Sequence, residues 1–231
     1  MKLLYEGKAK KFFFDEENKI YIQEFKDSLT AFNGEKYAEK EGKGKLNCQI
    51  STTLFKYLEN NGIKTHFIKE GDSPNKMIVE YLDIIPLEVV MRNIAAGSIV
   101  KRLGLEKGKL FESPLFELYL KNDELGDPMI NRWHAFSLGL ATDKEIDSMV
   151  ELAFKINKLL FDFFKKRGYN LVDIKFEFGR KNGELILGDE ISPDTFRLWD
   201  NEGKNYDKDV FRKDTGDVIQ TYEKVLEIVT Q

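Results

Sequence analysis

Alternating apolar and polar positions predict several β-strands in the first third of the chain. The runs are rich in aromatic and β-branched side chains and are separated by clusters of Gly, Asn and Asp, a pattern typical of strands joined by turns. Strands are expected at residues 3–5, 10–14, 19–25 and 77–82. Before the last of these, apolar residues recur at helical spacing from Leu46 to Leu58, and Asn61-Gly62 is expected to end that helix.

The pattern changes around residues 80–86, where a boundary between two lobes, 1–82 and 83–231, is predicted. Directly after it, residues 87–93 form an apolar strand pattern. A turn of small residues then leads into a short helix over residues 99–103.

Two amphipathic helices are predicted in the second half of the chain. The stronger one runs from Asp143 to about Arg167, and Thr142 and Glu145 have the spacing of a capping box at its start. The other is expected over about residues 216–229. Their apolar stripes are interpreted as core surfaces and receive no functional role.

The segment 171–179 has the most informative alternation. One face of the expected strand carries apolar side chains, and the other carries three ionisable ones, Asp173, Lys175 and Glu177. Because a strand this apolar is expected to be buried, its ionisable groups need partners to offset their desolvation. A divalent cation, phosphates or a charged substrate would supply them. The row is therefore interpreted as the floor of an active site.

A hairpin is expected directly after this strand, because Asn182-Gly183 favours a two-residue turn. In that register Asp189 would face the core, and a bulge at Gly188 is expected to return it to the side that carries Glu177. The two carboxylates are then predicted to converge, as magnesium ligands do. A solvated hairpin face is the alternative.

The N-terminal turn has features of a phosphate-binding loop. Gly7 allows the backbone to approach a ligand, and Lys8 and Lys10 flank Ala9 at the start of the next strand, from which a lysine can reach a phosphate chain. A lysine-rich surface hairpin is the competing interpretation.

Two further segments combine charge with loop or turn positions. Arg92 ends an apolar strand, and Gly97-Ser98 opens a helix, a combination that suits a phosphate monoester. Ser98 as a plain helix cap is the alternative. Asp194 and Arg197 form an acid–base pair in a loop, which indicates either a binding segment or a simple salt bridge.

Composition narrows the class of protein. The 40 acidic residues outnumber the 36 basic ones, and the net charge of −4 argues against a general nucleic-acid binder. Cys48 is the only cysteine, so no disulfide can form within the chain and a reducing compartment is expected. Charged residues interrupt the N-terminus, and no apolar run approaches the ~20 residues of a spanning helix. A soluble, cytoplasmic protein without a membrane or nucleic-acid partner is expected.

Together these segments resemble the SAICAR synthetase family of purine biosynthesis. The most characteristic matches are IIPLEVVMRNIAAGS at 84–98 and LVDIKFEFG at 171–179. LYEGKAK at 4–10, LYLKND at 118–123, Asp127-Pro128 and GDEISPDTFRLWD at 188–200 also fit, in the expected order and over nearly the whole chain.

The resemblance implies a two-lobed α+β fold. An N-terminal, mainly antiparallel β lobe would bind the nucleotide, a larger C-terminal α/β lobe would carry the metal and ribotide sites, and ATP would lie in the cleft between them. The implied activity is that of an ATP-dependent ligase, which joins the ribotide CAIR to L-aspartate through an acyl phosphate and releases SAICAR, ADP and phosphate. Magnesium as a cofactor and a homodimer are also implied.

The resemblance assigns roles to individual residues. ATP would be contacted by Gly7, Lys8, Ala9 and Lys10, and its adenine by Glu80, Leu82 and Ile84. Magnesium would be bound by Glu177 and Asp189. The ribotide phosphate would be held by Arg92, Ser98 and Arg197, with Asp194 on the ribose. The reacting carboxylate or the incoming aspartate would be surrounded by Asp173, Lys175, Lys121 and Arg212.

Two rival functions stay open on sequence alone. A small-molecule kinase would use the same ATP site and stop after phosphoryl transfer, without needing an amine. A nucleotide-binding module without catalysis would be expected to lose some of the charged set, which is intact at Lys10, Lys175, Glu177 and Asp189.

Overall fold

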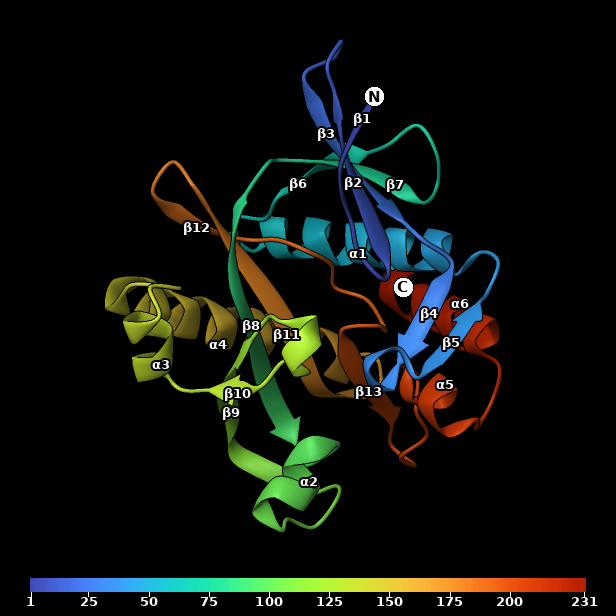
Figure 1. The fold of residues 1–231 in the computed structure, drawn as a ribbon. Coiled ribbons are helices and arrows are strands. Elements are labelled where there is room, and N and C mark those ends of the chain that lie inside the picture. Colours follow the sequence, from blue (N-terminus) through green and yellow to red (C-terminus); the bar gives the residue numbers. More distant parts are fainter. The chain divides into compact units, whose positions relative to one another are not determined.

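The computed structural model describes residues 1–231, the side chain at position 33 excepted. The chain forms two compact units (Figure 1). The first contains Met1–Leu82, Gly188–Asp194 and Tyr206–Gln231, and the second contains Asp83–Leu187 and Thr195–Asn205. The sequence placed all of 83–231 in one lobe. Two of its segments instead belong to the first unit, because their side chains enter buried polar and apolar clusters there.

The first unit is built on a five-stranded antiparallel sheet with the order β1-β2-β3-β7-β6. Its strands are β1 (Lys2–Glu6), β2 (Lys10–Asp15), β3 (Ile20–Phe25), β7 (Lys76–Val79) and β6 (Phe67–Glu70). A separate two-stranded sheet pairs β4 (Ser28–Ala31) with β5 (Lys36–Glu39). The strand predicted at 77–82 is thus shorter than expected and ends at Val79.

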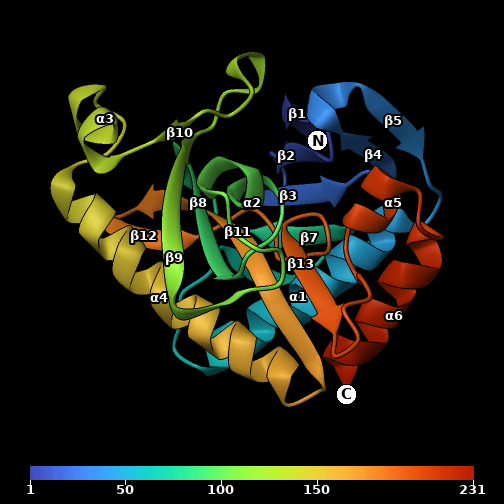
Figure 2. The ribbon, with the colours of Figure 1, turned by 90° about the horizontal axis from the view of Figure 1, so that it is seen from below.

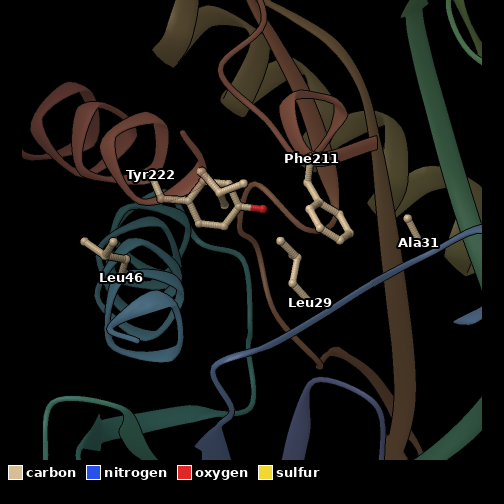
Figure 3. Packing of buried hydrophobic residues seen from close by; sticks show 6 residues of the cluster. Leu29, Ala31, Leu46, Phe211 and Tyr222 are labelled. Carbon is tan, nitrogen blue, oxygen red and sulfur yellow. The ribbon is translucent and has the colours of Figure 1, made fainter. Parts of the chain in front are cut away.

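Three helices complete the first unit, α1 (Lys43–Asn60), α5 (Asp209–Lys213) and α6 (Val218–Thr230), with a 3₁₀ turn at Phe32–Gly34. Helices α1 and α6 pack against each other, and α1 also contacts β3, β6 and β7. Figure 3 shows the apolar cluster in which Leu46 of α1 meets Tyr222 of α6, beside Leu29 and Phe211. This contact explains why the C-terminal segment belongs with the first 82 residues.

The second unit contains a six-stranded antiparallel sheet with the order β10-β9-β8-β11-β12, in which β13 also pairs with β11. The strands are β8 (Asp83–Ile94), β9 (Leu110–Leu120), β10 (Met129–Ile130), β11 (Tyr169–Lys181), β12 (Glu184–Leu187) and β13 (Phe196–Asp200). The helices are α2 (Ser98–Leu103), α3 (Arg132–Ser137) and α4 (Asp143–Lys165), with a 3₁₀ turn at Asp123–Leu125.

Helix α4 lies along one face of this sheet, over β8 and β11, as Figure 2 shows. Its buried side chains include Ile156 and Phe164, and the ring of Phe164 packs 5.5 Å from that of Phe196. The capping box predicted for Thr142 and Glu145 is confirmed at the start of the helix. The helix therefore covers the apolar side of β11 and leaves the charged side for other contacts.

The predicted hairpin is confirmed, but the predicted bulge at Gly188 is wrong. Strands β11 and β12 are joined at Asn182-Gly183, which have φ angles of +51° and +79°. Strand β12 ends at Leu187, and Asp189 takes a φ of +60° outside any strand. The chain avoids placing Asp189 in the core by leaving the sheet rather than by bulging within it.

Within the described residues, no helix is both long enough and apolar enough to cross a membrane.

Candidate active site

Charged side chains line one face of the six-stranded sheet in the second unit. The strand register pairs Glu88 with Tyr119 on one side and Glu177 on the other, and it pairs Arg92 with Asp173. Because directly paired residues of neighbouring strands share a face, these side chains all project to the same side. The alternation predicted for 171–179 is therefore confirmed, and it continues onto both neighbouring strands.

Glu177 is the most enclosed carboxylate of this face, with 3% of its side chain exposed. The Lys175 ammonium group lies 2.8 Å from Glu177 Oε1 and also 2.8 Å from Glu88 Oε1. Lys121 donates to Glu177 Oε2. Two ammonium groups thus offset the buried charge of Glu177. The predicted site residues Lys121, Lys175 and Glu177 therefore lie together.

Asp173 holds two arginines at the far end of the same face. Its Oδ2 atom accepts hydrogen bonds from Arg92 Nη1 at 3.1 Å and Arg197 Nη1 at 2.8 Å. Burial disfavours the charged form of Arg92, but the charges of Asp173 and Glu117 outweigh it and raise its pKa. Both predicted phosphate-binding arginines are therefore brought together as cations. Arg197 lies on β13 rather than in a loop.

Gly97 allows Arg197 to lie directly against the backbone before α2. A Cβ atom at Gly97 would be 2.8 Å from Arg197 Nη2, and the φ angle of +65° favours glycine. Gly97 is the N-cap residue, whereas the exposed Ser98 is the first residue of the helix. The alternative in which Ser98 is a plain helix cap is therefore wrong.

In the first unit, Lys10 joins β2 to the segment that follows β12. Its ammonium group contacts Asp189 and lies 2.6 Å from Glu190 Oε1. Gln23 of β3 donates to the carbonyl of Asp189 at 2.9 Å, and Ser192 Oγ donates to Glu190 Oε2 at 2.5 Å. The lysine predicted to bind phosphates and one carboxylate predicted to bind magnesium are thus neighbours.

Asp194 lies in a buried polar cluster of the first unit, with 4% of its side chain exposed. Its Oδ2 atom is 2.6 Å from Lys43 Nζ and accepts from Asn47 at 3.1 Å, and its Oδ1 atom accepts from the Tyr222 hydroxyl at 2.7 Å. Burial opposes ionisation, but Lys208 and Lys43 hold the pKa of Asp194 well below its usual range. These contacts indicate that Asp194 anchors the segment 188–194 within the first unit. They are less consistent with the predicted contact to ribose.

The backbone of the turn between β1 and β2 is held by hydrogen bonds within the turn and from the segment after β3. Gly7 N donates to Lys10 O at 2.9 Å, and the Lys8 carbonyl accepts from Ser28 Oγ at 2.5 Å. The Ala9 carbonyl accepts from Lys26 N at 2.8 Å. The backbone of the predicted phosphate loop is therefore fixed, and Lys8 is exposed.

Three residues predicted to contact adenine lie at the end of β7 and the start of β8. Glu80 N donates to His66 O at 2.7 Å, so this N–H group has a protein partner. Leu82 is buried and Ile84 is exposed. The predicted aspartate ligand Arg212 lies on α5, where Nη1 is 2.7 Å from Asp209 Oδ1.

The described residues contain no group of three or more His, Cys, Asp or Glu side chains arranged to hold a metal ion. Magnesium in nucleotide enzymes commonly uses one or two carboxylates, and phosphate oxygens and waters complete its shell. Glu177 and Asp189 supply such hard oxygen donors, and both already contact ammonium groups. The donor chemistry therefore fits magnesium, and the convergence of the two carboxylates stays a prediction.

Sequence reasoning missed Glu88, Arg102, Glu117 and Tyr119. Glu117 Oε2 is 2.7 Å from Arg92 Nε, and the Tyr119 hydroxyl donates to the same oxygen at 2.8 Å. A signal was present, because Glu117, Tyr119 and Lys121 occupy alternate positions, as Asp173, Lys175 and Glu177 do. Arg102 contacts Glu117 from α2, and no local pattern indicates that contact.

Comparison with curated proteins identifies relatives that match along the whole chain. A phosphoribosylaminoimidazole-succinocarboxamide synthase from Pyrococcus abyssi is 56% identical over 230 residues, which cover 98% of this chain and 97% of that protein. A synthase of the same name from Clostridium perfringens is 48% identical over 227 residues, which cover 98% of this chain and 96% of that protein.

Solved structures with the same fold are also found. One described as SAICAR synthetase (Type-2) in complex with ADP superposes with a TM-score of 0.94 at 52% identity, covering 99% of this chain and 97% of that chain. The synthase from Ehrlichia chaffeensis superposes with a TM-score of 0.95 at 44% identity, covering 99% and 98%. The α+β fold expected from the sequence is confirmed. Since a family model described as SAICAR synthetase also matches residues 3–229, the chain belongs to the SAICAR synthetase family.

Proposed function

We infer that the protein is an ATP-dependent ligase of purine biosynthesis. It joins the carboxylate of CAIR to the amine of L-aspartate and gives SAICAR, ADP and phosphate. Family membership over residues 3–229 supports this activity. The observation that carries it is the charged face of β11, where Asp173 holds two arginines and Glu177 holds two lysines.

The chemistry requires activation before the amide can form, because a carboxylate is a poor acyl donor. A carboxylate oxygen of CAIR attacks the γ-phosphorus of ATP, the bond from that phosphorus to the bridging oxygen breaks, and ADP leaves. The aspartate nitrogen then attacks the acyl carbon, phosphate departs, and the nitrogen loses a proton. No protein nucleophile is needed, so alignment and neutralisation of charge supply the catalysis.

The charged face supplies groups for both steps. Lys175 and Lys121 are proposed to neutralise charge at the reacting carboxylate, with Asp173 beside it. Arg92, Ser98 and Arg197 are proposed to bind the ribotide phosphate, for which two guanidinium groups held on one carboxylate are suited. Arg212 stays a proposed ligand of aspartate.

ATP is proposed to contact the turn formed by Gly7, Lys8, Ala9 and Lys10. The hydrogen bonds that close this turn support a fixed backbone for phosphate binding. Glu80, Leu82 and Ile84 are proposed for the adenine. Because the N–H group of Glu80 donates to His66, its carbonyl oxygen is the group proposed to contact the base.

Magnesium is proposed to be held by Glu177 and Asp189 together with phosphate oxygens. When bound, it supplies positive charge that offsets the phosphate charge. For the wild-type protein, product formation should require CAIR, L-aspartate, ATP and magnesium together. ADP release without L-aspartate would instead favour a small-molecule kinase.

Glu177→Gln tests the central carboxylate. We expect kcat to fall about 100-fold or more, because a neutral amide is a poor ligand for magnesium and balances the two lysines less well. The free magnesium concentration for half-maximal activity should rise in parallel. Glu184→Gln, on the exposed part of β12, is the matched control and should keep wild-type activity. Wild-type turnover and magnesium dependence in Glu177→Gln would remove Glu177 as a metal ligand.

The protein is also proposed to be a cytoplasmic homodimer without membrane or nucleic-acid partners. The family resemblance supports a dimer, and a role in purine biosynthesis supports the location. Light scattering on the purified protein would measure its mass in solution against the 26.9 kDa chain.

A further inference from the structure

Arg92 and Arg102 share one buried carboxylate in the second unit. Glu117 has 5% of its side chain exposed and lies on β9, beside β8. Its Oε2 atom is 2.7 Å from Arg92 Nε, and its Oε1 atom accepts from Arg102 Nη2. Burial opposes ionisation of Glu117, but the Arg92 hydrogen bond and the two arginine charges hold its pKa below the usual value. Glu117 is therefore a charged group that fixes both guanidinium groups.

Tyr119 completes this arrangement from the same strand. Its hydroxyl donates to Glu117 Oε2 at 2.8 Å and accepts from Arg102 Nη1 at 3.0 Å and Arg92 Nη2 at 3.3 Å. Each arginine thus contacts both Glu117 and Tyr119, and these contacts limit the rotation of both guanidinium groups. Arg102 differs from Arg92 in burial, because 30% of its side chain is exposed, whereas 5% of Arg92 is.

This cluster brings three guanidinium groups together. Arg92 and Arg102 both contact Glu117, and Arg92 and Arg197 both contact Asp173. Placing like charges close together in a partly desolvated site is unfavourable unless anions join them. A dianionic phosphate monoester would add such negative charge, and planar guanidinium groups bind phosphates in a bidentate manner.

We propose that Arg102 is a third arginine that binds the phosphate of the ribotide, and that Glu117 is the positioning residue that holds Arg92 and Arg102 for it. This inference rests on the proposed function, because it takes CAIR as the ligand. Arg102 follows the proposed phosphate ligand Ser98 by one turn of α2, so both project from the same short helix.

Arg102→Ala tests the direct contact, by titration calorimetry with CAIR and with its dephosphorylated riboside. Loss of one charge-assisted contact should weaken CAIR binding about 10- to 100-fold. Affinity for the riboside should change less than about 2-fold, since the riboside has no phosphate to lose. Lys101→Ala, at the exposed neighbouring position on α2, is the matched control and should bind both ligands as the wild type does.

Glu117→Gln tests the positioning role, because glutamine keeps the size and one acceptor oxygen but removes the charge. We expect KM for CAIR to rise about 10-fold, with KM for ATP and for L-aspartate unchanged. Glu112→Gln, an exposed carboxylate on the same strand, controls for charge removal. Urea unfolding of each variant shows whether the fold is kept.

Equal losses of CAIR and riboside affinity in Arg102→Ala would assign Arg102 to the framework and overturn its phosphate contact. Unchanged CAIR affinity in Arg102→Ala would overturn it as well. Failure of the wild type to form SAICAR from CAIR and L-aspartate would instead reject the proposed function. If Glu117→Gln unfolds, Arg102→Ala still decides the phosphate contact, because Arg102 is partly exposed.

Discussion

The backbone of Gly97 lies directly against the guanidinium group of Arg197, although the two residues are 100 positions apart in the sequence. A Cβ atom at Gly97 would lie 2.8 Å from Arg197 Nη2 and 3.0 Å from both Cζ and Nη1. Arg197 is also held by Asp173 at 2.8 Å, so it has little freedom to move away. Gly97 therefore leaves the space in which Arg197, an arginine proposed to bind phosphate, is held.

Gly97→Ala should raise KM for CAIR about 10-fold or more, because the methyl group displaces the Arg197 guanidinium. The φ of +65° should also cost about 1–3 kcal/mol of stability. Gly104→Ala is the control, since Gly104 has a φ of +61° but no atom within 4 Å of a Cβ there. It should lose stability and keep the KM. Equal KM values for CAIR in the two variants would contradict the role given to Gly97.

Asp194→Asn should destabilise the first unit rather than weaken substrate binding. Removing one partner of a buried ion pair costs about 3–5 kcal/mol, because Lys43 then keeps an uncompensated charge. The midpoint of urea unfolding should fall sharply, while KM for CAIR measured well below that midpoint should stay near the wild-type value.

Lys43→Met provides the matched comparison, since it removes the other charge of the same pair. If Asp194 only anchors its segment, both variants should lose comparable stability and keep their KM values for CAIR. A raised KM for CAIR in Asp194→Asn, with its stability kept, would restore the ribose contact that the family resemblance implies.

The two faces of β11 can be predicted from the sequence, because side chains at alternate positions of a strand point to opposite faces of its sheet. The alternation alone places Asp173, Lys175 and Glu177 on one side of the strand, and the capping box of Thr142 predicts the start of α4. Both features depend on residues within a few positions of one another. Local spacing alone was sufficient for them.

Long-range contacts were beyond such patterns. The segment with Asp194 belongs to the first unit because of Lys43, and the pair is separated by 151 positions. The contact of Arg102 with Glu117 depends on how the segment between α2 and β9 places the helix beside the strand. The position of Asp189 depends on where β12 ends, and a left-handed backbone at an aspartate has no reliable sequence signal.

Glu145 should make stability depend on pH in the acid range. The hydrogen bond from Arg180 is the main cause that lowers the pKa of Glu145 from 4.5 to about 2. Because the folded value lies below the unfolded one, this stabilisation is present above about pH 4.5 and is lost as the pH falls towards 2. At pH 6 Glu145→Gln should be less stable than the wild type by about 2 kcal/mol.

Urea unfolding at pH 6 and pH 3 checks this effect. The difference between the wild type and Glu145→Gln should shrink at pH 3, because below about pH 4.5 the unfolded wild type binds a proton at Glu145 that the folded state, with its lower pKa, does not yet bind. Asp162→Asn, at a half-buried carboxylate on the same helix, should show a much smaller difference at either pH. A gap between the wild type and Glu145→Gln that stays constant from pH 6 to pH 3 would rule out the ionic contribution.

Lys10→Met should impair both ATP binding and the order of the segment after β12. Lys10 contacts Asp189 and lies 2.6 Å from the buried carboxylate of Glu190, so its loss leaves two acidic groups without their common cation. Stability should fall by about 1–3 kcal/mol. KM for ATP should rise about 10-fold or more, because the two acidic groups would then repel the ATP phosphates and the phosphates would lose their contact with the Lys10 ammonium group.

Lys11→Met, on the other face of β2, is the control and should change neither the stability nor the KM for ATP by much. Reduced stability of Lys10→Met with an unchanged KM for ATP would make Lys10 a structural residue. The phosphate contact would then have to come from Lys8.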